Sequence, residues 1–151
     1  MKSEVSPRLP DCVCATLRQV TRAITQMYDE GLRPSGLRGM QFQILMTIRG
    51  HSELSISQLT RIVTLDQTTA TRSMALIEKN GWVERVEQAD RRLRVYQLSK
   101  EGQAVLEVAM PLWSALQQRV LEEVGAEAWV SARGPMEALW KLAIRVPDQC
   151  R

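Results

Sequence analysis

Residues 55–81 read SISQLTRIVTLDQTTATRSMALIEKNG and carry two helix-start signals separated by a short turn. In the first signal, the hydroxyl of Ser55 and the side chain of Gln58 can satisfy free N–H groups at a helix start, which is a capping box. Asp66 supplies the second cap, and Gly81 is typical of the position just beyond a helix end. The stretch therefore predicts a short helix, a tight turn and a longer helix, which is the order of a helix-turn-helix unit.

The longer of these helices has one apolar and one polar face. Ala70, Met74 and Ile77 recur at i, i+4 and i+7, which is the spacing of a buried face. A helix that enters the major groove of DNA reads base edges with polar side chains on its outer face. Arg72 is a natural donor to guanine, and the free N–H groups of the first turn suit a phosphate. The predicted DNA contacts on this helix are Gln67, Thr68, Thr69, Thr71, Arg72 and Ser73.

A β-hairpin is predicted directly after the longer helix, where alternating residues at 82–87 and 93–98 flank a tip at 88–91. A β-ribbon in this position forms the wing of a winged helix. A guanidinium at the tip can enter a narrow minor groove, where the potential is most negative, and a neighbouring acid can hold it in place. The residues expected in these roles are Arg91 and Arg92, with Asp90 as their organiser.

Amphipathic helices are predicted on both sides of this unit. The first begins after Asp11, ends at Gly31 and carries apolar residues at heptad spacing. Such a narrow seam packs either against a second subunit or against the rest of its own chain. The seam consists of Val13, Leu17, Val20, Ile24 and Met27.

Two further helical segments are predicted after the hairpin. Ser99 caps a long helix that ends at Gly125, and a final segment covers 126–144. Gly134 and Pro135 are expected to interrupt that segment, because proline lacks an N–H and clashes with the preceding turn of a helix.

The composition bounds the class of protein. The chain has 151 residues, of which 44% are hydrophobic and 25% charged, as in an ordinary single globular domain. Its net charge of +3 permits a polyanionic partner without requiring one. A membrane span, a secretory signal and a disulfide framework are not expected, so we expect a soluble cytoplasmic protein. One histidine and the lack of a Gly-rich phosphate loop argue against an enzyme, and we expect no cofactor.

Taken together, the motifs of this chain resemble those of the MarR family of winged-helix transcription regulators, over nearly the whole length. The resemblance implies a mainly helical protein with a small β-wing, in which 37–99 form the DNA-binding core and 11–32 and 100–146 form dimerisation helices. It also implies a homodimeric repressor that binds a pseudo-palindromic operator in double-stranded DNA and is released by a small molecule or by oxidation. The motifs lie at residues 57–59, 65–72, 76–83, 90–92 and 98–102.

The resemblance also implies roles for individual residues. It places Arg92 in the minor groove with Asp90 as its organiser, and it favours the second-subunit interpretation of the heptad seam. Members of this family often bind aromatic or phenolic ligands between the dimerisation helices and the winged helix. Trp113, Trp129 and Trp140 are the candidates for lining such a space, with plain interface core as the alternative role.

Cys12 and Cys14 lie in the first turn of the predicted first helix, where the helix dipole and the nearby Arg18 favour a reactive thiolate. On a helix the two side chains point about 200° apart and cannot pair without unwinding the turn. Three interpretations remain open. They are partly buried inert packing, oxidation sensing, and binding of a soft metal or metalloid ion, to which a dimer can add Cys150.

Cys14 is similar in position to the reactive cysteine of the OhrR group of organic-peroxide sensors within this family. In that group, tyrosines of the partner subunit hydrogen-bond the thiolate, and Tyr28 matches one of them. The other tyrosine falls at Gly39, which departs from the pattern. Because Tyr28 and Cys14 are about 21 Å apart along one helix, they can meet only across a dimer.

A winged-helix module that binds protein instead of DNA is the main alternative of another class. Such modules often lack a basic wing and a polar outer helix, whereas this chain has Arg72, Arg91 and Arg92. The salt dependence of DNA binding separates the two, because phosphate contacts release counterions. A repressor that responds to a soft metal through Cys12 and Cys14 is the second alternative.

Overall fold

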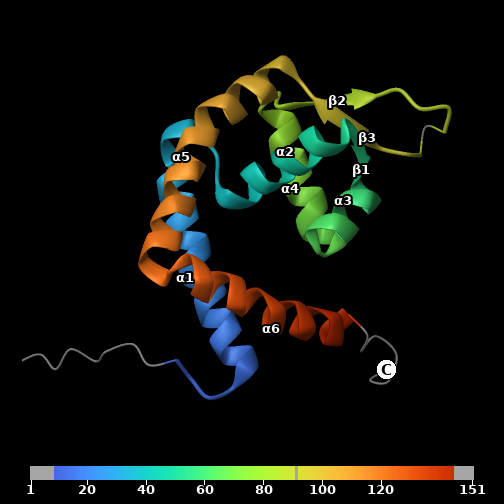
Figure 1. Cartoon of the computed structure of the whole chain (residues 1–151). Coiled ribbons are helices and arrows are strands. Elements are labelled where there is room, and N and C mark those ends of the chain that lie inside the picture. Colours follow the sequence, from blue (N-terminus) through green and yellow to red (C-terminus); the bar gives the residue numbers. More distant parts are fainter. Residues whose placement is uncertain (1–8, 91, 145–151) are drawn as a thin grey trace, which may run out of the picture. The chain divides into compact units, whose positions relative to one another are not determined.

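The computed structural model describes residues 9–90 and 92–144, and Figure 1 shows the course of the chain. Two compact units are present, Met1–Trp113 and Ser114–Arg151. The class is mainly helical with a small antiparallel sheet, as predicted, and no helix in the described ranges has the length and apolarity needed to cross a membrane. The elements are α1 (Val13–Leu32), η1 (Arg33–Ser35), α2 (Gly39–His51), β1 (Glu53–Ser55), α3 (Ile56–Val63), α4 (Gln67–Lys79), β2 (Val83–Val86), β3 (Val95–Leu98), α5 (Lys100–Val124) and α6 (Ala126–Ile144).

The predicted helix-turn-helix is confirmed as α3 and α4, and both caps form. The main-chain N–H of Gln58 donates to the Ser55 hydroxyl at 3.2 Å, and the main-chain N–H of Ser55 donates to the side-chain oxygen of Gln58 at 2.9 Å. Thr64 takes the left-handed φ of 55° in the turn between the helices. Asp66 caps α4 by accepting the N–H of Thr69 at 2.9 Å. These local bonds fix where each helix begins.

The core of the first unit lies between α2, α3, α4 and the sheet. The predicted buried face of α4 is confirmed, since Ala70, Met74 and Ile77 are almost completely buried. Removing these apolar side chains from water holds α4 in place while its opposite face stays exposed. Their most deeply buried counterparts on α2, α3 and β3 are Ile44, Leu45, Ile48, Leu59 and Tyr96.

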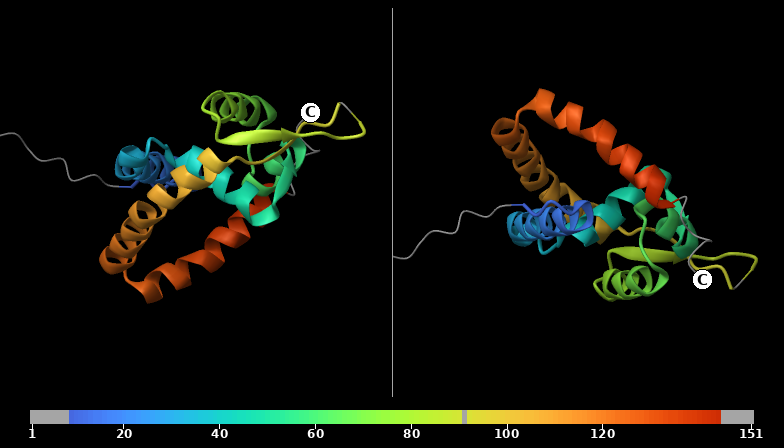
Figure 2. Two further views of the ribbon diagram at one scale, coloured as in Figure 1. Left: turned by 90° about the horizontal axis from the view of Figure 1, so that it is seen from above. Right: turned by 90° about the horizontal axis from the view of Figure 1, so that it is seen from below.

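The wing belongs to a three-stranded antiparallel sheet in the order β1-β3-β2, not to the two-stranded ribbon that the sequence pattern predicts. The additional strand β1 pairs Leu54 with Tyr96 of β3. The predicted strands at 82–87 and 93–98 are also too long, because pairing stops at Val86 and Val95, and the predicted tip at 88–91 lies in the connection between these two residues. Beyond that pair Gln88 is half-buried and the other described side chains up to Arg94 are exposed, so no core keeps the strands in register. Figures 1 and 2 show the connection projecting away from α2, α3 and α4.

One serine ties the start of α5 to the end of α4. The Ser99 hydroxyl donates to the carbonyl of Gly81 at 2.6 Å and accepts the N–H of Gly102 at 2.9 Å. A Cβ at position 102 would lie 1.9 Å from the carbonyl oxygen of Trp82, so only glycine fits there. Gly81 has a φ of 72°, the left-handed conformation expected just beyond a helix. We call Gly81, Trp82, Ser99 and Gly102 the α4–α5 clasp.

Two predicted helix breaks are wrong. α1 continues through Gly31 to Leu32, which it carries into the core, and the left-handed turn comes at Gly36, with a φ of 82°. α6 continues through Gly134 and Pro135. Because α6 is almost entirely exposed, water can satisfy the carbonyl that loses its N–H partner to the proline.

Candidate nucleic-acid interface

The outer face of α4 is a polar surface opposite its buried face. Of the predicted contacts on this helix, Thr69 and Ser73 are half-buried and the others are exposed. The Arg72 guanidinium forms no ion pair within the described ranges, so its donors remain available to a ligand. The exposed predicted contacts are Gln67, Thr68, Thr71 and Arg72.

Two threonine hydroxyls of α4 already donate within the helix. The hydroxyl of Thr69 donates to the carboxylate of Asp66, and that of Thr71 donates to the main-chain carbonyl of Gln67 at 2.7 Å. The bond from the Thr69 hydroxyl is the largest cause that lowers the pKa of Asp66. Neither hydroxyl therefore has a proton left for a base, and the donors of this face belong to the other predicted contacts.

Two exposed apolar residues on α4 were missed by the sequence analysis. Ala75 is exposed one turn beyond Thr71, and Leu76 is 48% exposed. The helical repeat could have found Ala75, because it completes the i, i+3, i+4, i+7 series that starts at Thr68.

The wing connection brings Asp90 and Arg92 together through the main chain. The Asp90 carboxylate accepts the main-chain N–H of Arg92 at 2.9 Å, and the Asp90 carbonyl accepts the N–H of Leu93 at 3.0 Å. No ion pair joins this carboxylate to the Arg92 guanidinium, so Asp90 organises the turn and leaves the exposed guanidinium free. The other predicted wing residue, Arg91, lies outside the described residues.

An ion pair connects the wing to α4. Nε of Arg85 on β2 lies 2.7 Å from a carboxylate oxygen of Glu78 on α4, and the guanidinium lies 5.9 Å from the ring centroid of Tyr96. The hydrogen bond with Glu78 is the largest cause that raises the pKa of Arg85, which stays charged. The pair is too exposed to add much stability, and β2 is held in place by its pairing with β3. No sequence signal indicated this pair.

Trp113 borders an apolar cavity of about 490 Å³ in the first unit. Its ring stacks on that of Phe42, with centroids 5.9 Å apart. Tyr28 lines the same cavity, and burial raises the pKa of its phenol, so the hydroxyl keeps its proton at neutral pH. Gly39 lies against Tyr28 at this wall, where a Cβ would be 3.5 Å from that of the tyrosine. The position at which the OhrR pattern has a second tyrosine is therefore part of the cavity wall and carries no side chain.

Trp129 and Trp140, the other predicted lining residues, lie on α6 in the second unit. They are 39% and 49% exposed. Since they are about three turns apart, they share one face of the helix with Met136. This α6 face is apolar and remains exposed.

Both N-terminal cysteines are free and exposed in the described part of the chain. Cys12 is the extended residue before the helix, and α1 begins at Val13, so the angle predicted between two helical cysteines does not apply. Cys14 shares a pocket of about 350 Å³ with Arg18 and Arg22. Within residues 9–90 and 92–144, which exclude Cys150, no three metal-ligating side chains come together.

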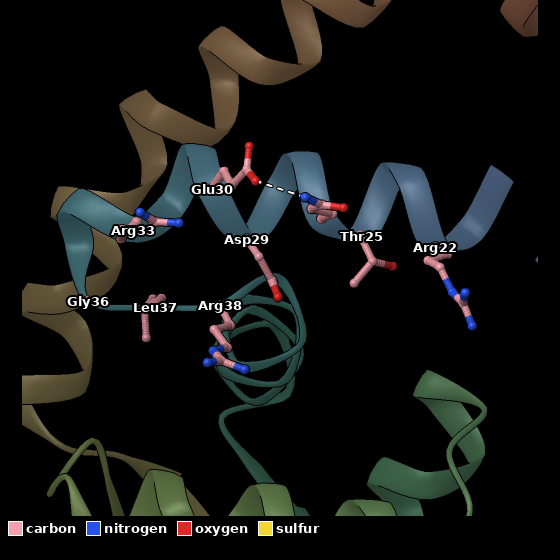
Figure 3. A pocket seen from close by; sticks show the side chains of 9 residues that line it. Arg22, Thr25, Asp29, Glu30, Arg33, Gly36, Leu37 and Arg38 are labelled. Atoms are coloured by element: carbon pink, nitrogen blue, oxygen red, sulfur yellow. Dashed lines mark hydrogen bonds between the residues drawn. The ribbon is translucent and has the colours of Figure 1, made fainter. Parts of the chain in front are cut away.

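A polar pocket of about 600 Å³ lies where α1, η1 and α2 meet, and Figure 3 shows its side chains. Asp29 of this pocket accepts the N–H of Gly39 at 2.7 Å, which ties α1 to the start of α2. Its basic side chains are solvent-exposed and form no ion pair in the described part of the chain, although the carboxylates of Asp29 and Glu30 line the same pocket. The basic side chains are Arg22, Arg33 and Arg38.

Relatives of known class match both the winged helix and the flanking helices. The model of the MarR family matches residues 35–93. An uncharacterised HTH-type transcriptional regulator of Bacillus cereus is 31% identical over 108 residues, which are 72% of either chain. The transcriptional repressor MprA of Escherichia coli is 34% identical over 96 residues, covering 56% of this chain and 54% of MprA.

A solved structure extends the likeness over most of the chain. The Mycobacterium tuberculosis transcriptional regulator MosR, in complex with DNA, is 33% identical and superposes with a TM-score of 0.81. The match covers 89% of this chain and 98% of the MosR chain, so it includes helices outside the segment that the family model matches. These relatives are transcription regulators and not enzymes. The chain belongs to the MarR family of transcription regulators.

Proposed function

We propose that this regulator is a homodimeric repressor that acts in the cytoplasm by binding a pseudo-palindromic operator in double-stranded DNA. The observation that carries the proposal is the outer face of α4, which exposes Thr68 and Arg72 while the opposite face is fixed in the core. A helix held in this way reads base edges in the major groove. Two copies related by a twofold axis then read the two half-sites.

The wing is the second contact of the proposal. Arg92, exposed beside the turn that Asp90 organises, enters the minor groove next to each half-site. Arg91 adds positive charge near the DNA phosphates beside this groove. The solved complex of MosR with DNA, from a relative 33% identical to this chain, supports DNA as the partner.

The apolar seam of α1 supports the homodimer. Val13, Leu17, Val20 and Ile24 are all more than a third exposed. A continuous stripe of large apolar side chains is unfavourable in water and marks an interaction surface. The exposed α6 face adds a second surface of the same kind. The proposed dimerisation helices are accordingly 11–32 and 100–146, with the DNA-binding core at 37–99.

DNA binding is tested by fluorescence anisotropy on the DNA upstream of the protein's own gene, across a range of salt. Several phosphate contacts predict a loss of about 10³-fold or more in affinity between about 50 and 200 mM salt. Arg72→Ala should cost about 1–3 kcal/mol and relax the preference at one base pair. Arg92→Ala should weaken binding without dissociating the dimer. Arg49→Ala on α2 is the control, because it removes the same charge at a residue outside the proposed DNA contacts. Binding that is absent at low salt would favour a protein-binding module.

Two features support two possible release signals. Cys14 is exposed beside Arg18, which is the environment of an oxidant-sensitive thiol. The cavity beside Trp113 has the volume and the aromatic lining of a small-molecule site. We therefore propose that oxidation of Cys14 or an aromatic ligand releases the DNA. Tyr28 lines the cavity and is about 21 Å from Cys14 along the same helix. A contact between this tyrosine and a Cys14 thiolate would therefore have to form across the proposed dimer.

The two signals are separated in one series of measurements. Anisotropy is followed after addition of an organic hydroperoxide and then of a reductant, for wild type, Cys12→Ser and Cys14→Ser. Reversible loss of binding that disappears in Cys14→Ser supports the thiol switch. Binding that ignores peroxide but falls with an aromatic acid, and does so less in Trp113→Ala, supports the cavity. Release by Zn²⁺ or Cu(I) that a chelator reverses and Cys14→Ser abolishes would favour a metal sensor instead.

A further inference from the structure

Thr71 presents its methyl group, not a hydrogen-bond donor, on the outer face of α4. Its hydroxyl donates to the carbonyl of Gln67, one turn back, at 2.7 Å. The hydroxyl and the methyl diverge from the same Cβ, so directing the hydroxyl along the helix leaves the methyl on the exposed surface. The side chain is therefore apolar toward a ligand, with one oxygen that can only accept.

Ala75 continues this apolar surface. It is exposed and follows Thr71 by one helical turn, so the two side chains are neighbours on the same face, about 5–6 Å apart. Arg72 directly follows Thr71 in the sequence, and Thr68 lies one helical turn before Arg72. Both side chains lie alongside Thr71 and Ala75, and both are exposed. The outer face of α4 thus carries a row of methyl groups next to a row of donors.

We propose that Thr71 and Ala75 form a methyl edge that selects thymine beside the base pair read by Arg72. The inference rests on the DNA binding proposed above and assigns part of its sequence specificity. Thymine alone carries a 5-methyl group in the major groove, and the methyls of alanine and threonine are the side-chain groups that contact it. The donors of Arg72 then meet the acceptors of a guanine.

The size of the effect follows from the area of one methyl group. Burying one CH₂ or CH₃ group is worth about fourfold in affinity. This is smaller than the loss expected for a bidentate arginine contact, so the methyl edge refines the choice of operator without creating the affinity.

The test uses the full chain and a duplex that it enriches from a random-sequence pool. Each thymine of a half-site is replaced in turn by uracil, which removes the 5-methyl group and keeps the base pair. At the contacted thymine, uracil should weaken wild-type binding about fourfold. Thr71→Val keeps the methyl and loses the hydroxyl, so it should bind like wild type and lose the same factor on uracil. Thr71→Ser keeps the hydroxyl and loses the methyl, so it should be weaker on thymine and indifferent to uracil.

Thr47→Ser on α2 is the matched control, because the Thr47 hydroxyl makes the same bond to the Gln43 carbonyl, at 2.8 Å, at the cavity beside Trp113 and not on the outer face of α4, and no cavity ligand is added in this test. Its DNA affinity should be that of wild type. The methyl edge is overturned if every uracil substitution is neutral, or if Thr71→Val weakens binding as much as Thr71→Ser. If no duplex is enriched and binding is absent at low salt, the proposed DNA-binding function itself fails, and this result is distinct from tight binding that ignores uracil.

Discussion

The winged helix and α6 place their apolar side chains in opposite environments. Ile44, Leu45 and Met74 of the winged helix are at most 1% exposed, whereas every large apolar side chain of α6 is at least 36% exposed. Both regions are amphipathic helices in sequence, so the pattern alone does not distinguish them. The difference shows that the winged helix is stabilised by its own core, while α6 needs an apolar surface from elsewhere.

The largest expected effect is a clash inside the α4–α5 clasp. Gly102→Ala would place a Cβ 1.9 Å from the Trp82 carbonyl oxygen, and we expect a loss of about 3 kcal/mol in the free energy of unfolding. Urea denaturation measures it. Gly50→Ala on α2 is the control, because nothing lies within 4 Å of its Cβ, and it should stabilise by at most about 1 kcal/mol. Equal stability of wild type and Gly102→Ala would show that the clasp does not hold the winged helix together.

A charge on the α6 face should break the proposed dimer. Trp140→Glu would bury an unpaired carboxylate, so the dissociation constant should rise at least about 100-fold. Analytical ultracentrifugation measures the change. Ile62→Glu on α3 puts the same charge at a side chain that is 47% exposed, and it should leave the dimer intact. A Trp140→Glu dimer as tight as wild type would mean that α6 does not meet another subunit through this face.

Removing the hydroxyl of Ser99 should weaken the winged helix by a smaller amount. Ser99→Ala leaves the Gly81 carbonyl and the Gly102 N–H without their partner, which costs about 2 kcal/mol in the free energy of unfolding. Ser114→Ala, at an exposed serine of α5 in the second unit, should stay within about 0.5 kcal/mol of wild type. If Ser99→Ala and Ser114→Ala lose the same free energy of unfolding in urea, the hydrogen bonds of Ser99 stabilise the fold no more than those of a solvated serine.

The smallest effect concerns the cap of α4 in acid. The pKa of Asp66 is lowered in the folded chain, so its ionised cap stabilises fully above the ordinary carboxyl pKa and is lost as pH falls through the lower folded value. Wild type should therefore be slightly more stable than Asp66→Asn at neutral pH. Thermal unfolding should show this difference shrinking below about pH 4. A difference that grows in acid would contradict the assignment.

The helix-turn-helix was predictable because its signals are local. Ser55 and Gln58 cap α3, and Asp66 caps α4, through atoms only a few residues apart. β1 was not predictable, because a three-residue strand shows no alternation and exists only through the pairing of Leu54 with the distant Tyr96. The predicted helix breaks at Gly31 and Pro135 were wrong for a related reason, because burial of Leu32 and exposure of α6 to water decide whether such a residue ends its helix.

The candidate site was predictable as a face and not as a set of contacts. Periodicity placed Arg72 on the outside of α4, but it did not show that the Thr71 hydroxyl donates within the helix. Asp90 was expected to hold an arginine side chain, but its carboxylate instead accepts the main-chain N–H of Arg92. Donor and acceptor assignments of this kind depend on side-chain rotamers, which no spacing rule specifies.

The boundary between the units at Trp113 and Ser114 affects how the protein is made. The contacts of the first unit are complete at Trp113, so the winged helix can fold while residues 114–151 are still being added at the ribosome. At about 5–20 residues per second this interval lasts a few seconds. The apolar residues of the α6 face, from Trp129 to Trp140, are added only after the first unit has been made. A nascent chain therefore offers its two exposed apolar surfaces at different times, with the α1 seam before the winged helix and the α6 face after it.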